Sequence, residues 1–166
     1  MMAVTAVHIR PAEPRDVAAL LQLKGALQRE EGAIEAFLPD AELWSRRMFG
    51  RDPNFAALIA EHQTTAIGLL TYNLKHYTGW PAPALFLQDI FVEPFFRRRG
   101  IALQLMRGLA KHAVAGGVEH IELVVRADNP ARGFYEHIGL FAVEEAVTYI
   151  GDRVTIQSLA GNASLK

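Results

Sequence analysis

Three consecutive arginines and a glycine, Arg97 to Gly100, separate a predicted buried strand from a predicted helix. The first amides of a helix have no intrahelical acceptor, and the helix dipole adds partial positive charge at the same end. Guanidinium groups match the geometry of a phosphate, and a glycine lets a ligand come close to the backbone. We therefore expect a phosphate site whose ligands lie in one short segment: Arg97, Arg98, Arg99, Gly100, Ile101 and Ala102.

This segment differs from two common phosphate loops. It lacks the Gly-Lys-Ser or Gly-Lys-Thr of a P-loop, and it lacks the three-glycine spacing of the dinucleotide fingerprint. A run of arginines by itself is more typical of a solvated loop. The position between a strand and a helix is what favours phosphate binding.

The elements that position this loop alternate in an order typical of one mixed α/β sheet with helices on both faces. Apolar periodicity predicts helices after Pro14, at 40–48 and 101–115, and after Asn129-Pro130. Strand patterns predict seven strands, at 4–10, 55–60, 67–72, 85–92, 121–125, 141–150 and 153–159.

Composition sets further limits. The chain has 166 residues, of which 51% are apolar and 21% charged, and this balance is typical of a single globular domain over 1–166. The absence of cysteine excludes disulfides and cysteine nucleophiles, and the histidines lack metal-ligand spacing. The net charge of -1 disfavours nucleic acid as a partner. No apolar run is long enough to span a membrane and no signal peptide is evident, so we expect a cytoplasmic protein.

Two segments resemble signatures of the GCN5-related N-acetyltransferase (GNAT) family. The segment from Arg97 to Ala102 matches the family's phosphate motif, which is Arg or Gln, two residues, Gly, one residue, and then Gly or Ala. The second signature is matched by Asn129 to Leu140. The resemblance extends over about residues 5 to 160. It implies a single domain with the GNAT acyl-CoA N-acyltransferase fold, an α/β fold with a mixed sheet of about seven strands.

The resemblance also implies acetyl-CoA as co-substrate, with no metal. In the family a bulge in the strand before the loop, here 87–92, splays the sheet and receives the thioester. The main chain at the end of that strand pairs with the pantetheine arm. The residues implied to bind acetyl-CoA, besides the loop, are Ile90, Phe91, Val92, Asn129 and Arg132. Asn129 is alternatively a helix cap.

Two residues are catalytic candidates. Tyr135 matches the family tyrosine that protonates the leaving thiolate, and a phenol with a pKa near 10 carries its proton at neutral pH. The alternative is a core tyrosine with a satisfied hydroxyl. Asp89 lies inside an apolar strand, where a carboxylate needs a partner. It is either a structural acceptor or the group that binds the attacking ammonium and removes its proton, directly or through water. Strand alternation predicts that Gln88 and Asp89 point to opposite faces.

Within the family the chain is most similar to the diamine (spermidine/spermine) N-acetyltransferase group, in segments of its N-terminal half and in the strand 85–92. That group usually has an acidic pair where this chain has Gln88-Asp89, so one carboxylate is missing. Polyamines, diamines and lysine-like amino acids therefore all remain possible acceptors. Expected acceptor-binding residues are Gln88, Asp89, Glu30 and Glu31, and Glu35 could extend the acidic lip. The three glutamates are alternatively a solvated helix end.

We therefore expect an enzyme, an acetyl-CoA-dependent N-acetyltransferase that acts on a small-molecule primary amine by direct attack in a ternary complex. One alternative is acetylation of a protein N-terminus or lysine, and another is a non-catalytic acyl-CoA-binding sensor. Many relatives are dimers, and the predicted terminal strands offer a route to a homodimer. The expected partners are thus a small amine and a second copy, not nucleic acid or a membrane.

Overall fold

The computed structural model describes residues 6–32, 40–146 and 148–160. These residues belong to two compact units, Met1–Arg126 and Ala127–Lys166, which are described separately. Within the described ranges, no helix combines the length and the apolar character needed to cross a membrane.

The first unit contains a five-stranded mixed sheet in which the spatial order of the strands follows the sequence. Its strands are β1 (His8–Pro11), β2 (Ala56–His62), β3 (Thr65–Lys75), β4 (Ala84–Val92) and β5 (His120–Leu123). The strands from β1 to β4 pair antiparallel, whereas β5 runs parallel to β4. The predicted mixed α/β sheet is confirmed, although it has fewer strands than expected.

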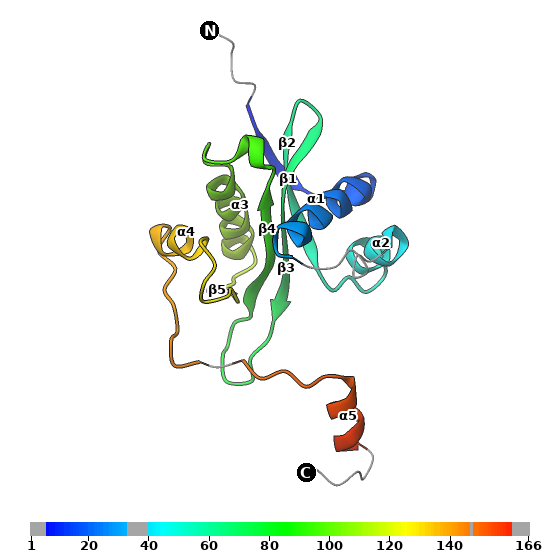
Figure 1. Cartoon of the computed structure of the whole chain (residues 1–166), viewed down its shortest axis with the longest axis vertical. Coiled ribbons are helices and arrows are strands. Elements are labelled where there is room, and N and C mark those ends of the chain that lie inside the picture. The colour runs from blue at the N-terminus through cyan, green and yellow to red at the C-terminus, as the bar shows by residue number, and fades with distance from the viewer. Residues whose placement is uncertain (1–5, 33–39, 147, 161–166) are drawn as a thin grey trace. The chain divides into compact units, whose positions relative to one another are not determined.

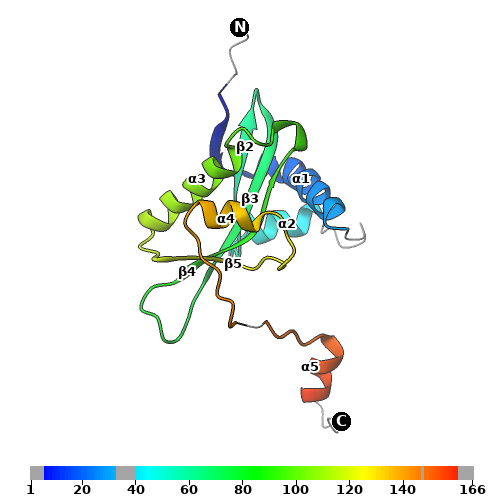
Figure 2. The ribbon, with the colours of Figure 1, turned by 60° about the vertical axis from the view of Figure 1, so that its left-hand side comes forward.

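Helices cover both faces of this sheet (Figures 1 and 2). The helices α1 (Val17–Glu30) and α2 (Ala41–Phe49) lie on one face, and α3 (Ile101–Ala115) lies on the other. Leu20 of α1 and Trp44 of α2 share a buried apolar cluster with Leu69 and Phe91 of the sheet. On the opposite face, Gly108 lets α3 lie close to the sheet, because a Cβ there would be 2.9 Å from a methyl group of Leu58.

The second unit differs most from expectation. It contains the helices α4 (Arg132–His137) and α5 (Arg153–Ala160), and neither terminal strand predicted at 141–150 and 153–159 is present among the described residues. Apolar alternation alone does not make a strand, because a strand also needs a pairing partner and an isolated strand pair is marginal in water. Asp152 instead caps a helix, since its side chain accepts a hydrogen bond from the Thr155 amide at 2.8 Å.

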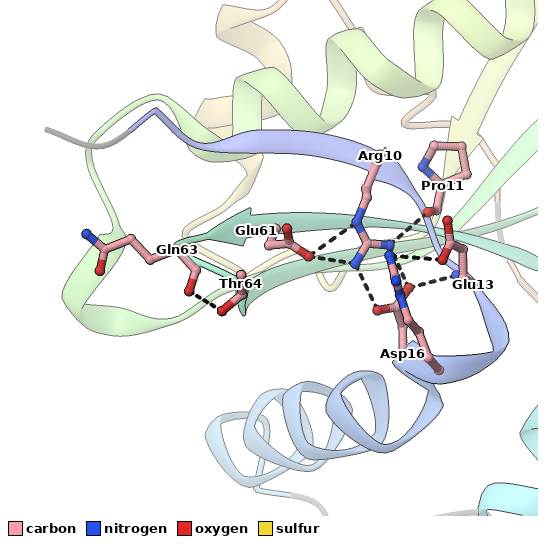
Figure 3. Close-up of polar contacts among 8 residues, drawn as sticks. Arg10, Pro11, Glu13, Asp16, Glu61, Gln63 and Thr64 are labelled. Carbon is pink, nitrogen blue, oxygen red and sulfur yellow. Dashed lines mark hydrogen bonds and ion pairs between the residues drawn. The ribbon is translucent and has the colours of Figure 1, made fainter.

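A partly buried arginine, Arg10, joins three segments of the first unit (Figure 3). The Arg10 guanidinium on β1 contacts the Asp16 carboxylate at 2.6 and 2.9 Å, and it contacts Glu61 of β2 at 2.6 Å. Asp16 directly precedes α1 and also accepts a hydrogen bond from the Glu13 amide at 2.7 Å. The hydrogen bonds from Arg10 hold the pKa of Asp16 below its usual value despite burial. This cluster therefore fixes the start of α1 against the sheet.

Asp16→Asn keeps the side-chain size but removes the charge opposite Arg10. We expect it to lower the free energy of unfolding at pH 7 by about 3 kcal/mol, the cost of breaking a largely buried ion pair. Because the pKa of Asp16 is lowered in the folded state, its contribution is present above the ordinary carboxyl pKa. It is lost as the pH falls through the folded-state pKa. The free energies of unfolding of Asp16→Asn and the wild type, measured with urea, should thus become equal at acid pH.

Arg15→Gln is the matched control, because it removes the exposed ion pair between Arg15 and Glu13. That change should cost less than about 1 kcal/mol. Equal stability of Asp16→Asn and the wild type at pH 7, or a difference that widens on acidification, would contradict the assigned role.

Candidate active site

The strand β4 has a strand neighbour on both edges only over its first half. β5 pairs with Ala84 through Leu87, and the last pair is Leu87 with Leu123. β3 continues along the other edge as far as Val92. Among the described residues, the β5 side of β4 therefore has no strand partner from Gln88 to Val92. Backbone groups on such an edge can bind an extended ligand much as a further strand would.

A bulge lies where the two strands separate. Thr71 of β3 is opposite Asp89, but the next residue, Tyr72, is opposite Leu87, so Gln88 is an extra residue. A bulge of this kind bends the strand, increases its twist and changes the direction of side chains. The bulge implied by the family resemblance is thus confirmed.

The bulge also overturns one prediction from strand alternation. Gln88 donates a hydrogen bond to the Asn73 side chain at 2.7 Å, and Asp89 accepts one from Thr71. Thr71 and Asn73 share one face of β3 because they are two residues apart. The prediction that Gln88 and Asp89 point to opposite faces is therefore wrong, because the inserted residue breaks the two-residue period.

Both carboxylate oxygens of Asp89 have partners. Lys24 Nζ on α1 lies 2.5 Å from Asp89 Oδ1, and Thr71 Oγ1 donates to Oδ2 at 2.7 Å. The Lys24 and Asp89 side chains are only 18% and 15% exposed. The carboxylate that the sequence suggested was buried inside an apolar strand is thus balanced by a cation from the neighbouring helix.

Lys24 was not among the predicted site residues. The signal that could have found it is its place on the apolar face of α1, four residues after Leu20 and three before Leu27. A lysine at such a position needs either solvent or a partner of opposite charge. Which partner it takes depends on the sheet register and could not be read from the helix alone.

A second group of contacts holds β5 in place where it still pairs with β4, before the pairing ends at Leu87. Glu122 of β5 accepts hydrogen bonds from Lys75 Nζ and from the Tyr77 hydroxyl. Burial raises the pKa of Glu122, but these two partners outweigh burial and lower it below the usual value. The parallel pairing of β4 with β5 is therefore supported by charge on the side chains as well as by the backbone.

The loop after β4 leads into α3 through left-handed backbone. Gly100 precedes α3 with φ of 77°, and Arg98 has φ of 62°. A Cβ added to Gly100 would meet no atom within 4 Å, so the space over the loop is open. Ile101 and Ala102 begin α3, and their amides belong to the helix end that lacks internal acceptors. This backbone geometry is compatible with a phosphate group, and the phosphate site stays a prediction.

The three arginines of the loop have different surroundings. Arg97 donates through Nε to the Val92 carbonyl at 2.7 Å, and through Nη2 to Glu30 at 2.6 Å. Arg99 instead lies over the rings of Phe95 and Phe96. Arg97 thus joins the loop to β4 and to the last residue of α1. Arg98 and Arg99 leave positive charge on the exposed surface of the loop.

The glutamates expected to form an acidic lip are not equivalent. Glu30 pairs with Arg97, so its charge is compensated within the protein. Glu31 directly follows α1 and is exposed. Glu35 lies outside the described residues. The structure therefore brings Gln88, Asp89 and Lys24 into one cluster and Glu30 into another.

The remaining candidates belong to the second unit. The Asn129 side chain accepts a hydrogen bond from the Ala131 amide at 2.8 Å in the turn before α4, and Ala131 rather than Asn129 is the residue at the N-terminal cap position of α4. Arg132 contacts the Ala127 carbonyl at 3.1 Å and Glu144 at 3.4 Å. Tyr135 is buried on α4 and has at least one interaction partner. Over the described parts of both units, no cluster of His, Asp and Glu side chains could hold a metal ion.

Comparisons with known proteins show the family and the fold. The model of the acetyltransferase (GNAT) family matches residues 22–140. The thialysine N-epsilon-acetyltransferase of Sus scrofa is 26% identical over 151 residues, which cover 86% of this chain and 89% of that protein. An integron cassette protein from the mobile metagenome of V. cholerae has the same fold, with a TM-score of 0.77 at 21% identity and coverage of 93% and 98%. The structure of aminoglycoside N-acetyltransferase AAC(6')-Iy in complex with CoA gives a TM-score of 0.73 at 22% identity, with coverage of 91% and 98%.

Proposed function

The chain belongs to the acetyltransferase (GNAT) family, and on this premise we propose that it transfers the acetyl group of acetyl-CoA to a primary amine of a small molecule. The observation that carries the proposal is the open edge of β4 from Gln88 to Val92, which leads directly into the loop before α3. An extended thioester arm with a phosphate end matches both features. The similarity to a thialysine acetyltransferase supports an amine as acceptor, and we propose a polyamine, a diamine or a lysine-like amino acid.

Acetyl-CoA would be held mainly by backbone groups. The main chain of Ile90, Phe91 and Val92 would pair with the pantetheine arm, because β5 has left that edge of β4. The amides of Gly100, Ile101 and Ala102 would bind the pyrophosphate, and Arg98 and Arg99 would add charge. Acetyl-CoA supplies an activated acyl group, and the protein supplies its alignment with the acceptor. We also propose that residues 1–166 act as one domain, since the family model includes residues from both units.

The residues needed for proton transfer are Asp89 and Tyr135. An alkyl ammonium must lose a proton before its nitrogen can attack, and Asp89 would bind the ammonium and pass that proton to water. The neutral amine then forms the new C–N bond, and a backbone amide at the end of β4 stabilises the oxyanion. As the C–S bond breaks, the Tyr135 hydroxyl protonates the thiolate, and the proton that the nitrogen loses as the amide forms passes to solvent and restores the phenol. The chain has no cysteine, so acetyl passes directly from CoA sulfur to the amine.

We expect Asp89→Asn and Tyr135→Phe each to lower kcat by about a hundredfold, the usual contribution of one general acid or base. Neither change should alter the KM for acetyl-CoA much, because the proposed cofactor contacts are mainly backbone groups. The measurement is CoA thiol release with a panel of amines at saturating acetyl-CoA. Circular dichroism of each variant checks that it is folded.

Two matched controls isolate the proton path. Glu61→Gln removes another ion-paired carboxylate from the same sheet, and Tyr149→Phe removes the hydroxyl of an exposed tyrosine. Both should retain kcat within about twofold, because neither belongs to the proposed path. Wild-type turnover in Asp89→Asn or Tyr135→Phe would remove that residue from the mechanism. Binding of acetyl-CoA without turnover of any amine would favour a sensor, and turnover of peptides alone would favour a protein acetyltransferase.

We further propose that the chain is a homodimer that uses its C-terminal segment. Large apolar side chains are exposed there, including Phe141, Tyr149 and Ile150, each at least 87% exposed. Clustered exposed apolar residues mark interaction sites in soluble proteins. A second copy would cover these side chains and would offer a strand with which the alternating segment 141–150 could pair.

Sedimentation velocity tests this assembly. The wild type should sediment at twice its chain mass of 18.4 kDa, and the double variant Phe141→Asp/Ile150→Asp should sediment as a monomer. Val114→Asp, which places the same charge on an exposed apolar position of α3, should remain dimeric. A wild type that sediments as a monomer at all concentrations would rule out the dimer.

A further inference from the structure

We propose that Lys24 is a specificity-determining residue. Its ammonium contacts one carboxylate oxygen of Asp89, where it competes with the ammonium of the acceptor. Lys24 thereby disfavours polycationic acceptors and favours an acceptor that carries a carboxylate as well as the reacting amine. The proposal rests on the function proposed above, because it uses Asp89 as the binding group for the acceptor.

The contacts of Asp89 show which of its two partners an incoming ammonium would compete with. One carboxylate oxygen is 2.5 Å from Lys24 Nζ, and the other accepts the Thr71 hydroxyl at 2.7 Å. Thr71 is 1% exposed and lies in the middle of β3, so its hydroxyl stays in place. Lys24 has a long flexible side chain on α1 and keeps some solvent exposure. An incoming ammonium therefore takes the position of Lys24 Nζ rather than that of Thr71.

The charges of the surrounding residues decide which class of acceptor binds more favourably after displacing Lys24. Gln88 is neutral where a second carboxylate would serve a polycation, and it is bonded to Asn73. Glu30 is already paired with Arg97 at 2.6 Å. A polyamine that displaces Lys24 thus brings further positive charge beside a released ammonium. An amino acid instead offers its ammonium to Asp89 and its carboxylate to Lys24, so that both charges of the original pair keep a partner.

Lysine and cadaverine test this directly, because cadaverine is lysine without the carboxylate. We would measure Kd for both by calorimetry in the presence of CoA, and kcat/KM by thiol release, with spermidine as a polycation. The wild type should prefer lysine to cadaverine. Lys24→Met, which keeps much of the side-chain length without the charge, should reduce that preference about tenfold, the effect of one neighbouring charge. Lys24→Arg should retain the preference, and the exposed α3 control Lys111→Met should not change it.

The ratio of two ligands is insensitive to a general loss of stability, because both ligands report on the same folded protein. An unchanged ratio in Lys24→Met with normal turnover would overturn the role of Lys24 and leave the proposed acetyltransfer intact. A changed Kd ratio without turnover of any amine would support Lys24 as the selective residue while contradicting the proposed reaction. Equal binding of lysine and cadaverine by the wild type would overturn the specificity proposal.

Discussion

A strand that loses one of its two neighbours partway along its length must satisfy its backbone polar groups in another way. In this protein β4 meets that constraint after Leu87, where the pairing with β5 ends while the pairing with β3 continues. The bulge at Gln88 lies at the same point and turns Asp89 toward Thr71 and Lys24. The free edge and the position of the Asp89 carboxylate therefore have a common structural origin. Both disappear if β4 is paired regularly over its whole length.

The helix α1 carries this arrangement into the rest of the first unit through three ion pairs along its length. Asp16 just before α1 binds Arg10 of β1, and Lys24 in the middle binds Asp89 of β4. Glu30 at its end binds Arg97 of the loop before α3. The position of one helix is thus coupled to β1, to Asp89 of β4 and to the loop before α3. The net charge of -1 is close to zero, and these oppositely charged side chains are paired with one another locally.

Local sequence signals predicted much of this structure, and the errors have physical causes. The helix at 101–115 was predicted because it carries a strong local pattern of apolar periodicity. Strand alternation failed at Gln88 and Asp89, because a bulge depends on the neighbouring strand and leaves no period of its own. The strands expected at 141–150 and 153–159 also depend on pairing partners far away in the chain or on another chain. The partnership of Lys24 with Asp89 spans 65 residues, so only the fold could reveal it.

Amide hydrogen exchange on adding ligand tests most directly the proposed binding of the pantetheine arm at the free edge of β4. CoA should slow exchange both at Ile90 to Val92 and at the first amides of α3. Adenosine 3′,5′-diphosphate, which lacks the pantetheine arm, should protect the start of α3 but not Ile90 to Val92. We predict that the β4 edge is protected by CoA and is not protected by adenosine 3′,5′-diphosphate. If CoA binds and the exchange of Ile90 to Val92 stays unchanged, the proposed site is wrong.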